Sequence, residues 1–152
     1  MFLADINGSG TADILYVKSD RVEIWFNQSG NAFSKPLTIY LPSRWDNLDQ
    51  ISFADVFGNS TTCMVFSESN PQPRHWCYDF CQGTKPHLLN QTDNNLGATT
   101  RITYGTSTKY YLEDKQNGRP WITNLPFPVQ VIEKVESWDA ISQTRLVLSL
   151  IH

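Results

Sequence analysis

The chain contains 152 residues and carries a net charge of −3, from 12 Lys plus Arg against 15 Asp plus Glu. Because no block of basic residues occurs, nucleic acid and anionic membranes are not expected as partners. No apolar run reaches the length of a transmembrane helix, and the N-terminus lacks the charged-then-apolar plan of a signal peptide. The composition therefore predicts a soluble chain, whose five tryptophans suit the broad, half-buried surfaces of β-sheets.

Residues 2–16 consist of two short apolar runs joined by a loop with oxygen-bearing side chains at alternate positions. A calcium ion takes six to eight oxygen ligands, and a tight loop supplies them from positions 1, 3, 5, 7 and 9. Gly10 falls at position 6, where the sharp turn requires a residue free of Cβ strain. The loop therefore predicts a weak calcium site, with an empty Asn-Gly or Ser-Gly turn as the alternative. The predicted ligands are Asp5, Asn7, Ser9, Thr11 and Asp13.

The sequence around this loop excludes an EF-hand. Position 12 of an EF-hand loop is a bidentate Glu, whereas this chain has Tyr16 there. The flanking residues 1–4 and 14–17 have the composition of strands rather than helices. We therefore expect the loop to join two strands.

The same layout returns 50 residues later, in residues 51–66. This second copy keeps the order of strand, Ala-Asp, turn and strand, but Phe57 occupies a ligand position and Cys63 replaces the closing Asp. We therefore expect Asp55 and its loop to bind no calcium. A period of 50 residues is typical of propeller blades or arrays.

The remaining segments also predict strands. Residues 21–26 alternate between apolar and polar, and residues 33–41 form a further strand in which Pro36 favours an edge position. With the two strands around the first loop, these give one four-stranded blade. Turns every 8–12 residues and the lack of sustained helical periodicity predict an all-β fold, either a propeller or a sandwich. The later predicted strands are residues 63–67, 75–78, 99–104, 110–112, 129–138 and 144–150, with a Pro-rich corner at residues 70–73.

Four potential metal ligands occur within thirteen positions: His75, Cys77, Cys81 and His87. This series is too compressed for a structural zinc site, which pairs two ligands across a short knuckle and two more after a longer span. We therefore expect structural cysteines and no zinc. With Cys63, the three cysteines are too few for a disulfide scaffold, but they allow one pair plus a free thiol.

No catalytic motif is present, whether a nucleophile elbow, a zinc-protease helix, a P-loop or a Cys-His signature. Glu113 and Asp114 are adjacent, and neighbours on a strand point to opposite faces, so they cannot share one substrate. We expect them to be solvated or paired with Lys115 or Arg119. The sequence therefore predicts a protein that is not an enzyme.

Six motifs follow one another along the chain: residues 3–8 (Leu-Ala-Asp-Ile-Asn-Gly), 25–31, 94–98 (Asn-Asn-Leu-Gly-Ala), 111–115 (Tyr-Leu-Glu-Asp-Lys), 118–121 and 125–129. In this order they resemble the middle region of the B component of bacterial insecticidal toxin complexes (Tc toxins), a relative of the Rhs-repeat toxin-wrapping proteins. The first motif alone is shared with integrin-like FG-GAP blades of many secreted proteins, but the ordered series is specific and covers nearly the whole chain.

The resemblance implies that residues 1–82 are about two late blades of the family's β-propeller, and that residues 83–152 lead into its hollow Rhs-type shell. In that family the propeller docks on the pore-forming A component. It also gates the exit of a toxic polypeptide held in the shell formed by the B and C components. Two departures are that the chain starts inside the family's region and that its sequence diverges after Arg145. A propeller needs at least four blades, so one copy cannot close the ring.

We therefore expect a non-enzymatic scaffold of a secreted toxin complex, with the A and C components as partners. A first alternative is a free-standing, calcium-binding FG-GAP module that binds a glycan or a protein. A second alternative is a fragment of an enzyme whose active site lies outside this chain. Flanking sequence would distinguish the three, through shell repeats, further calcium-type blades or a catalytic motif respectively.

Overall fold

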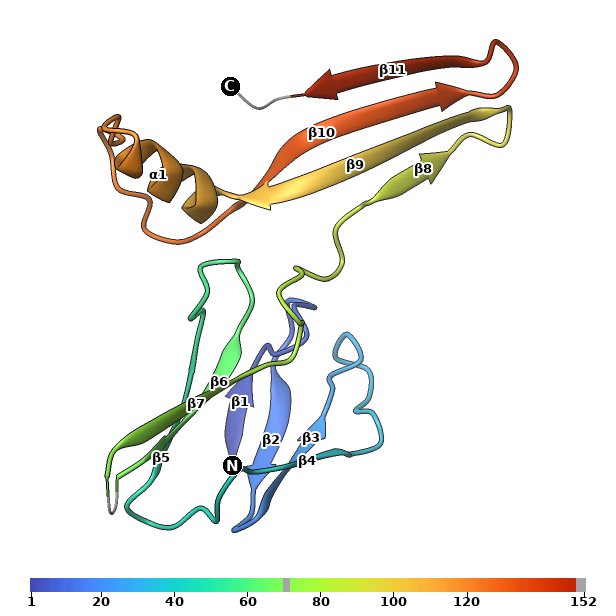
Figure 1. Cartoon of the computed structure of the whole chain (residues 1–152). Coiled ribbons are helices and arrows are strands. Elements are labelled where there is room, and N and C mark those ends of the chain that lie inside the picture. The colour runs from blue at the N-terminus through green and yellow to red at the C-terminus, as the bar shows by residue number, and fades with distance from the viewer. Residues whose placement is uncertain (70–71, 150–152) are drawn as a thin grey trace. The chain divides into compact units, whose positions relative to one another are not determined.

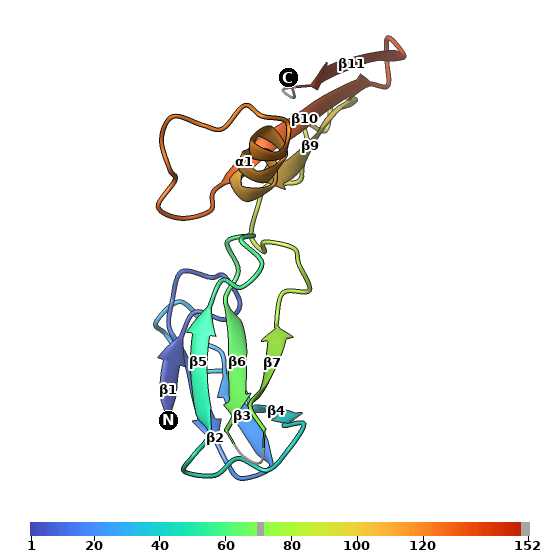
Figure 2. The ribbon, with the colours of Figure 1, turned by 60° about the vertical axis from the view of Figure 1, so that its left-hand side comes forward.

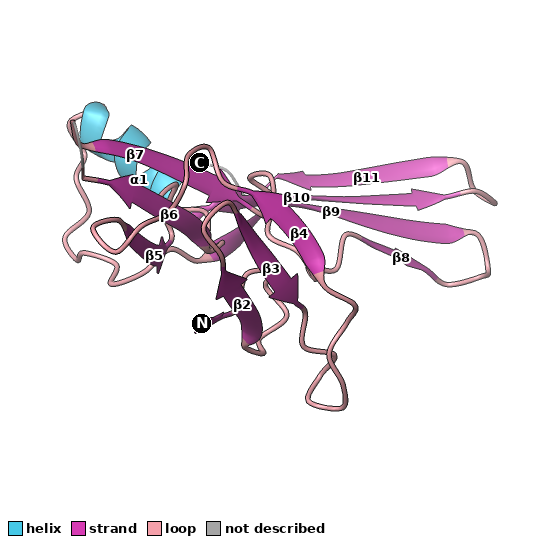
Figure 3. Ribbon diagram, turned by 90° about the horizontal axis from the view of Figure 1, so that it is seen from below, coloured by secondary structure: helices cyan, strands magenta, loops and turns pink. Residues whose placement is uncertain are grey.

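The computed structural model describes residues 1–69 and 72–149. The predicted corner at residues 70–73 and the last predicted strand residue, 150, lie partly or wholly outside the described residues. Apart from one short helix, the described chain is built from antiparallel strands, which confirms the all-β prediction (Figure 3). In chain order the elements are β1 Phe2–Ala4, β2 Asp13–Val17, β3 Arg21–Trp25, β4 Leu37–Tyr40, β5 Gln50–Ala54, β6 Cys63–Glu68, β7 Arg74–Asp79, β8 Gln91–Asp93, β9 Ala98–Thr106, α1 Ser107–Gln116, β10 Gln130–Asp139 and β11 Thr144–Ser149.

The chain divides into two compact units (Figures 1 and 2). Unit 1 comprises Met1–Phe57 and Thr61–His87, and unit 2 comprises Gly58–Ser60 and Leu88–His152. The functional division at residue 82, between propeller blades and shell strands, stays a prediction.

Unit 1 begins with a four-stranded sheet in the order β1-β2-β3-β4, so each strand pairs with its neighbour in sequence. Alternation of apolar and polar residues in β2 and β3 places Leu15, Val22 and Ile24 in the core with no exposed surface. Pro36 directly precedes β4, which lies at the edge of the sheet as predicted. The first four predicted strands are therefore confirmed.

A second sheet of unit 1 has three strands in the order β5-β6-β7. One apolar core joins it to the first sheet, because buried side chains of both sheets form a single cluster. Phe66 of β6, only 2% exposed, packs against Trp76 of β7 with ring centroids 5.4 Å apart. The buried members of the cluster are Ile6, Leu15, Val22, Ile24, Ile51, Met64 and Phe66.

Unit 2 consists of a four-stranded sheet in the order β11-β10-β9-β8, with α1 between β9 and β10 in the chain (Figure 1). On one face, Glu136 pairs with Lys134 at 2.9 Å and accepts a hydrogen bond from Arg145. The ammonium of Lys134 and the guanidinium of Arg145 lower the pKa of Glu136 to about 2. The neighbouring residues Leu146 and Leu148 are 71% and 54% exposed. The sheet of unit 2 therefore carries a cluster of paired charges and exposed apolar side chains.

The prediction of a strand at residues 110–112 is wrong, because this segment lies within helix α1. The Thr106 hydroxyl caps the helix by accepting a hydrogen bond from the backbone N–H of Lys109 at 3.3 Å. Asn117 closes the C-terminal end by donating its backbone N–H to the carbonyl of Glu113. The helix buries little apart from its first residue, so no apolar periodicity marks it in the sequence. None of the helical segments in the described part of the chain has the length and apolar character to cross a membrane.

The helix also changes the setting of the adjacent acidic pair. Asp114 accepts a hydrogen bond from the indole N–H of Trp121 at 2.8 Å and pairs with Arg119 at 3.5 Å. The predicted pairing with Arg119 is thus confirmed for Asp114. These contacts tie the helix to residues 119–121 of the segment that follows it.

Candidate functional site

The predicted calcium loop connects β1 to β2 and is held by hydrogen bonds from its own backbone. The carboxylate of Asp5 accepts from the backbone N–H of Ser9 at 3.0 Å and of Gly10 at 2.8 Å. The Asn7 side-chain oxygen accepts a second bond from the Ser9 N–H at 3.0 Å. Gly10 has φ of +83°, a left-handed conformation that favours glycine. The oxygen-rich side chains therefore shape the turn directly.

Asp13, the last predicted ligand, is fully buried. One of its carboxylate oxygens accepts from the backbone N–H of Ile6 at 3.1 Å, and the other accepts from the N–H of Asn27 at 2.8 Å. The carboxylate thus joins the start of the loop to the segment after β3. A buried carboxylate that satisfies two backbone donors has a structural role.

The second copy of the repeat places Cys63 at the position of Asp13. In the first sheet Ala4 pairs with Asp13, and in the second Ala54 pairs with Cys63. Cys63 is also fully buried, and the backbone of Val56, 50 residues after Ile6, forms a hydrogen bond with its sulfur. Burial is the main cause that raises the pKa of Cys63 to about 12. This position therefore serves in both copies as a buried acceptor for the loop backbone.

In the loop between β1 and β2, the hydrogen bonds leave part of the predicted ligand set able to bind calcium. The hydroxyl oxygens of Ser9 and Thr11 lie 2.9 Å apart, so both could ligate one ion. Asp5 and Asn7 keep lone pairs beyond those that accept backbone N–H groups. Asp13 likewise accepts one N–H on each oxygen, but it differs from Asp5 in being fully buried. Its part in the ligand set stays a prediction. The described residues contain no group of three or more His, Cys, Asp or Glu side chains that could hold a metal ion.

Calcium binding by the loop stays a prediction, and titration calorimetry tests it. We expect a dissociation constant of about 10⁻⁴–10⁻³ M, because few ligands are charged. Asp5→Ala should abolish the calcium heat, since it removes the charged ligand that faces the loop. Asp55→Ala, in the second copy, is the matched control and should leave calcium binding unchanged. Absence of heat at millimolar calcium in a folded chain would contradict the prediction.

Three residues of the series for which no zinc is expected, His75, Cys77 and Cys81, have separate partners. His75 Nδ1 lies 2.9 Å from the Ser67 hydroxyl on the neighbouring strand. Cys77 contacts Cys63, and the Cys81 thiol donates to the carbonyl of Ile6 at 3.4 Å. Each thiol therefore already has a contact within unit 1.

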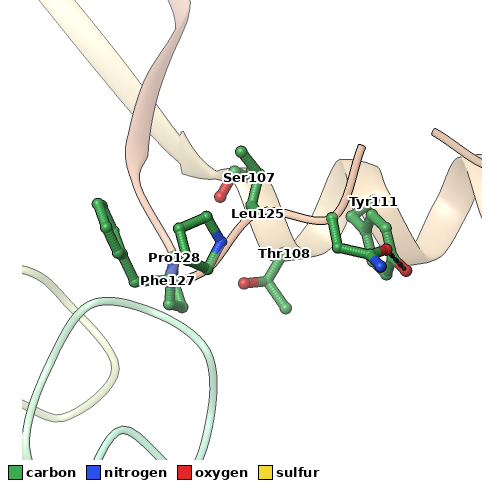
Figure 4. A pocket seen from close by; sticks show the side chains of 8 residues that line it. Ser107, Thr108, Tyr111, Leu125, Phe127 and Pro128 are labelled. Atoms are coloured by element: carbon green, nitrogen blue, oxygen red, sulfur yellow. Dashed lines mark hydrogen bonds between the residues drawn. The ribbon is translucent and has the colours of Figure 1, made fainter. Parts of the chain in front are cut away.

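A shallow pocket of about 260 Å³ lies in unit 2, between α1 and the Pro-rich segment that follows it (Figure 4). The Tyr111 hydroxyl donates to the side-chain oxygen of Asn124 at 3.2 Å. Ser107 accepts from the N–H of Val129 at 2.9 Å through its hydroxyl and donates its own N–H to the Val129 carbonyl. No carboxylate, imidazole, amine or thiol lines the pocket, so it has no group suited to proton transfer near neutral pH. Its lining residues are Ser107, Thr108, Tyr111, Asn124, Leu125, Pro126, Phe127 and Pro128.

Glu133, on β10, is a structural residue that sequence analysis missed. The register of β10 against β9 shifts between Ile132 and Lys134, which leaves Glu133 at a β-bulge. Its carboxylate accepts from the Tyr110 hydroxyl at 2.5 Å and from the Lys109 ammonium at 2.9 Å. These two hydrogen bonds lower the pKa of Glu133. A bulge has no composition signature in the sequence, so only the pairing of the strands reveals this anchor for α1.

The family described as "Insecticide toxin TcdB middle/N-terminal region" matches residues 26–150. None of the curated proteins matches.

Two solved structures illustrate the structural likeness. The Tc holotoxin pore of Photorhabdus luminescens, with a mutated TccC3, shares 35% identity with a TM-score of 0.83. A crystal structure of TcdB2-TccC3 shares 34% identity with a TM-score of 0.79. Each match covers 97% of this chain but 7% of the solved chain.

The family match and the structural matches agree, because both extend over most of the chain. They confirm the resemblance to the middle region of the toxin B component that the motifs indicated. The chain therefore belongs to the family of the insecticide toxin TcdB middle/N-terminal region.

Proposed function

We propose that this chain is a non-enzymatic scaffold segment of a secreted toxin complex, in which residues 1–82 contribute two propeller blades and residues 83–152 lead into the Rhs-type shell. The observation that carries the proposal is the structural match to TcdB2-TccC3 over 97% of the chain at 34% identity. The chain spans 7% of that protein. We therefore assign to this chain the role of one segment within a much larger toxin component.

The two sheets of unit 1 support the propeller assignment. Both are antiparallel, with strands paired in the order of the chain, as in a propeller blade. Both begin with a hairpin that has the same register, Ala4 with Asp13 and Ala54 with Cys63. Such a repeat of hairpin geometry at 50 residues fits successive blades.

The solved relatives support partners within the toxin complex. One structure contains TcdB2 with TccC3, and the other is a holotoxin pore. For this chain we propose that the propeller docks on the pore-forming A component and gates release of a polypeptide enclosed with the C component. Of these two roles, docking on the A component is the easier to test, because the proposed contact would be made by the propeller blades of unit 1.

The test restores the rest of the B component around this chain and measures binding to a cognate A-component pore. We expect binding by the restored protein and none by the 152-residue chain, because two blades cannot close a propeller. Asp13→Ala, which disrupts the first blade, should weaken binding to the A component. Thr38→Ala, an exposed change on β4, is the matched control and should bind normally.

Assays for hydrolase activity on the 152-residue chain complete the test. If the restored, folded propeller does not bind while the short chain turns over a substrate, the docking proposal is wrong. That result would instead support the enzyme alternative.

A further inference from the structure

Cys63 and Cys77 lie on neighbouring strands of the second sheet in unit 1. Strands β6 and β7 are antiparallel, with Cys63 opposite Asp79 and Val65 opposite Cys77. Side chains two residues apart on a strand share a face, and so do directly opposed residues. The two cysteines therefore occupy diagonal positions on one face of the sheet.

After burial, Cys77 is one of the groups that raise the pKa of Cys63, as expected for two thiols that lie beside each other on the same face. The Cα atoms of diagonal residues are farther apart than those of directly opposed residues. A disulfide between Cys63 and Cys77 therefore requires β7 to move slightly toward β6 at these positions. Strand β7 is at the edge of the β5-β6-β7 sheet, and in the described chain only β6 pairs with it. An edge strand can make this small shift without breaking pairing on its other side.

The third cysteine is held in a different setting. Strand β7 ends at Asp79, and Cys81 lies in the turn that follows, with its N–H donated to the Asp79 carboxylate at 2.9 Å. The backbone carbonyl of Cys81 accepts from Thr84 at 3.1 Å. Its thiol donates to the carbonyl of Ile6. Cys81 is therefore the free thiol of the three.

We propose that Cys63 and Cys77 form an intrachain disulfide when the chain meets an oxidising small-molecule disulfide, such as oxidised glutathione. The Cys77 thiolate attacks one sulfur of the oxidant, forms a mixed disulfide and releases one thiolate. Cys63 then loses its proton and attacks the Cys77 sulfur, which releases the second thiolate. Two electrons pass from the cysteine pair to the oxidant, and the two protons are taken up by the two released thiolates.

The order of the two steps follows from exposure. Cys77 is exposed and Cys63 is buried, so the oxidant reaches Cys77 first. The pKa of Cys63, raised to about 12 by burial, leaves little thiolate near neutral pH, so the second step is slow. The product would fasten the edge strand β7 to β6 in an oxidising medium.

The experiment incubates the 152-residue chain with excess oxidised glutathione and counts free thiols after denaturation. We expect the count to fall from three to one, with loss of two hydrogen atoms from the intact mass and no attached glutathione. Trypsin cleaves after Arg74, so the cross-link should join the peptide of residues 45–74 to that of residues 75–101. Cleavage after Tyr78 or Phe80 then separates Cys77 from Cys81 and identifies the partner.

Two variants keep the proposal falsifiable. Cys77→Ser changes an exposed side chain and should prevent the cross-link, leaving Cys63 and Cys81 as thiols. Cys81→Ser is the matched control and should still lose both remaining thiols. The proposal is overturned if the wild-type chain retains glutathione on Cys77, keeps three thiols, or links Cys77 to Cys81 instead.

Discussion

Replacing Asp13 with Ala is expected to destabilise unit 1 by about 4 kcal/mol, because one buried and one part-buried backbone N–H group lose their acceptor at about 1–3 kcal/mol each. Those donors are Ile6, at 3.1 Å, and Asn27, at 2.8 Å from the carboxylate. No water can replace the acceptor readily, since Asp13 has no exposed surface. Denaturation in urea measures the loss, and hydrogen exchange should localise it to β1, β2 and β3.

The control for this effect is Asp5→Ala, measured without calcium. The N–H groups that Asp5 accepts belong to Ser9 and Gly10, both exposed, so water can take over and the loss should stay below about 1 kcal/mol. Equal stability losses at positions 5 and 13 in a chelator would show that burial of the acceptor is not what matters. Rescue of Asp13→Ala by calcium would likewise contradict the structural role.

Gly105→Ala is expected to destabilise unit 2 by about 2 kcal/mol through overpacking. A Cβ at position 105 would lie 2.7 Å from Cδ and 2.9 Å from Cγ of Glu133, so the side chain must move away. That movement would also break the hydrogen bonds to Tyr110 and Lys109, which anchor α1. Urea denaturation gives the free energy, and hydrogen exchange in α1 should increase.

Glu133→Ala provides the partner for a double-mutant cycle. Glu133→Ala alone removes the anchor of α1, but it also opens the space beside Gly105. Once that space is open, Gly105→Ala should be neutral or slightly stabilising, because Ala restricts the unfolded chain more than Gly does. Additive losses in the double variant would contradict a steric origin.

The sequence by itself determined the hairpins, the repeat and the family. Alternating residues in β2 and β3 have one buried face, and such a period of two leaves little choice of structure. The Asp-x-Asn-x-Ser loop and its copy 50 residues later predicted the paired hairpins, because turn residues with left-handed backbone, such as Gly10, act locally. The ordered motifs identified the toxin family, because a family resemblance is read from the residues and their order and needs no tertiary structure.

Only the tertiary structure decided which roles these residues have. Asp13 matches a calcium ligand in sequence, but its burial turns the carboxylate toward the backbone of Ile6 and of the distant Asn27. The sequence did not predict helix α1, because the helix has no apolar face of its own. It is instead stabilised by the Thr106 cap and by the hydrogen bond from Tyr110 to Glu133 of β10. Such contacts join residues far apart in the chain, so they depend on strand register and bulges, which leave no local pattern in the sequence.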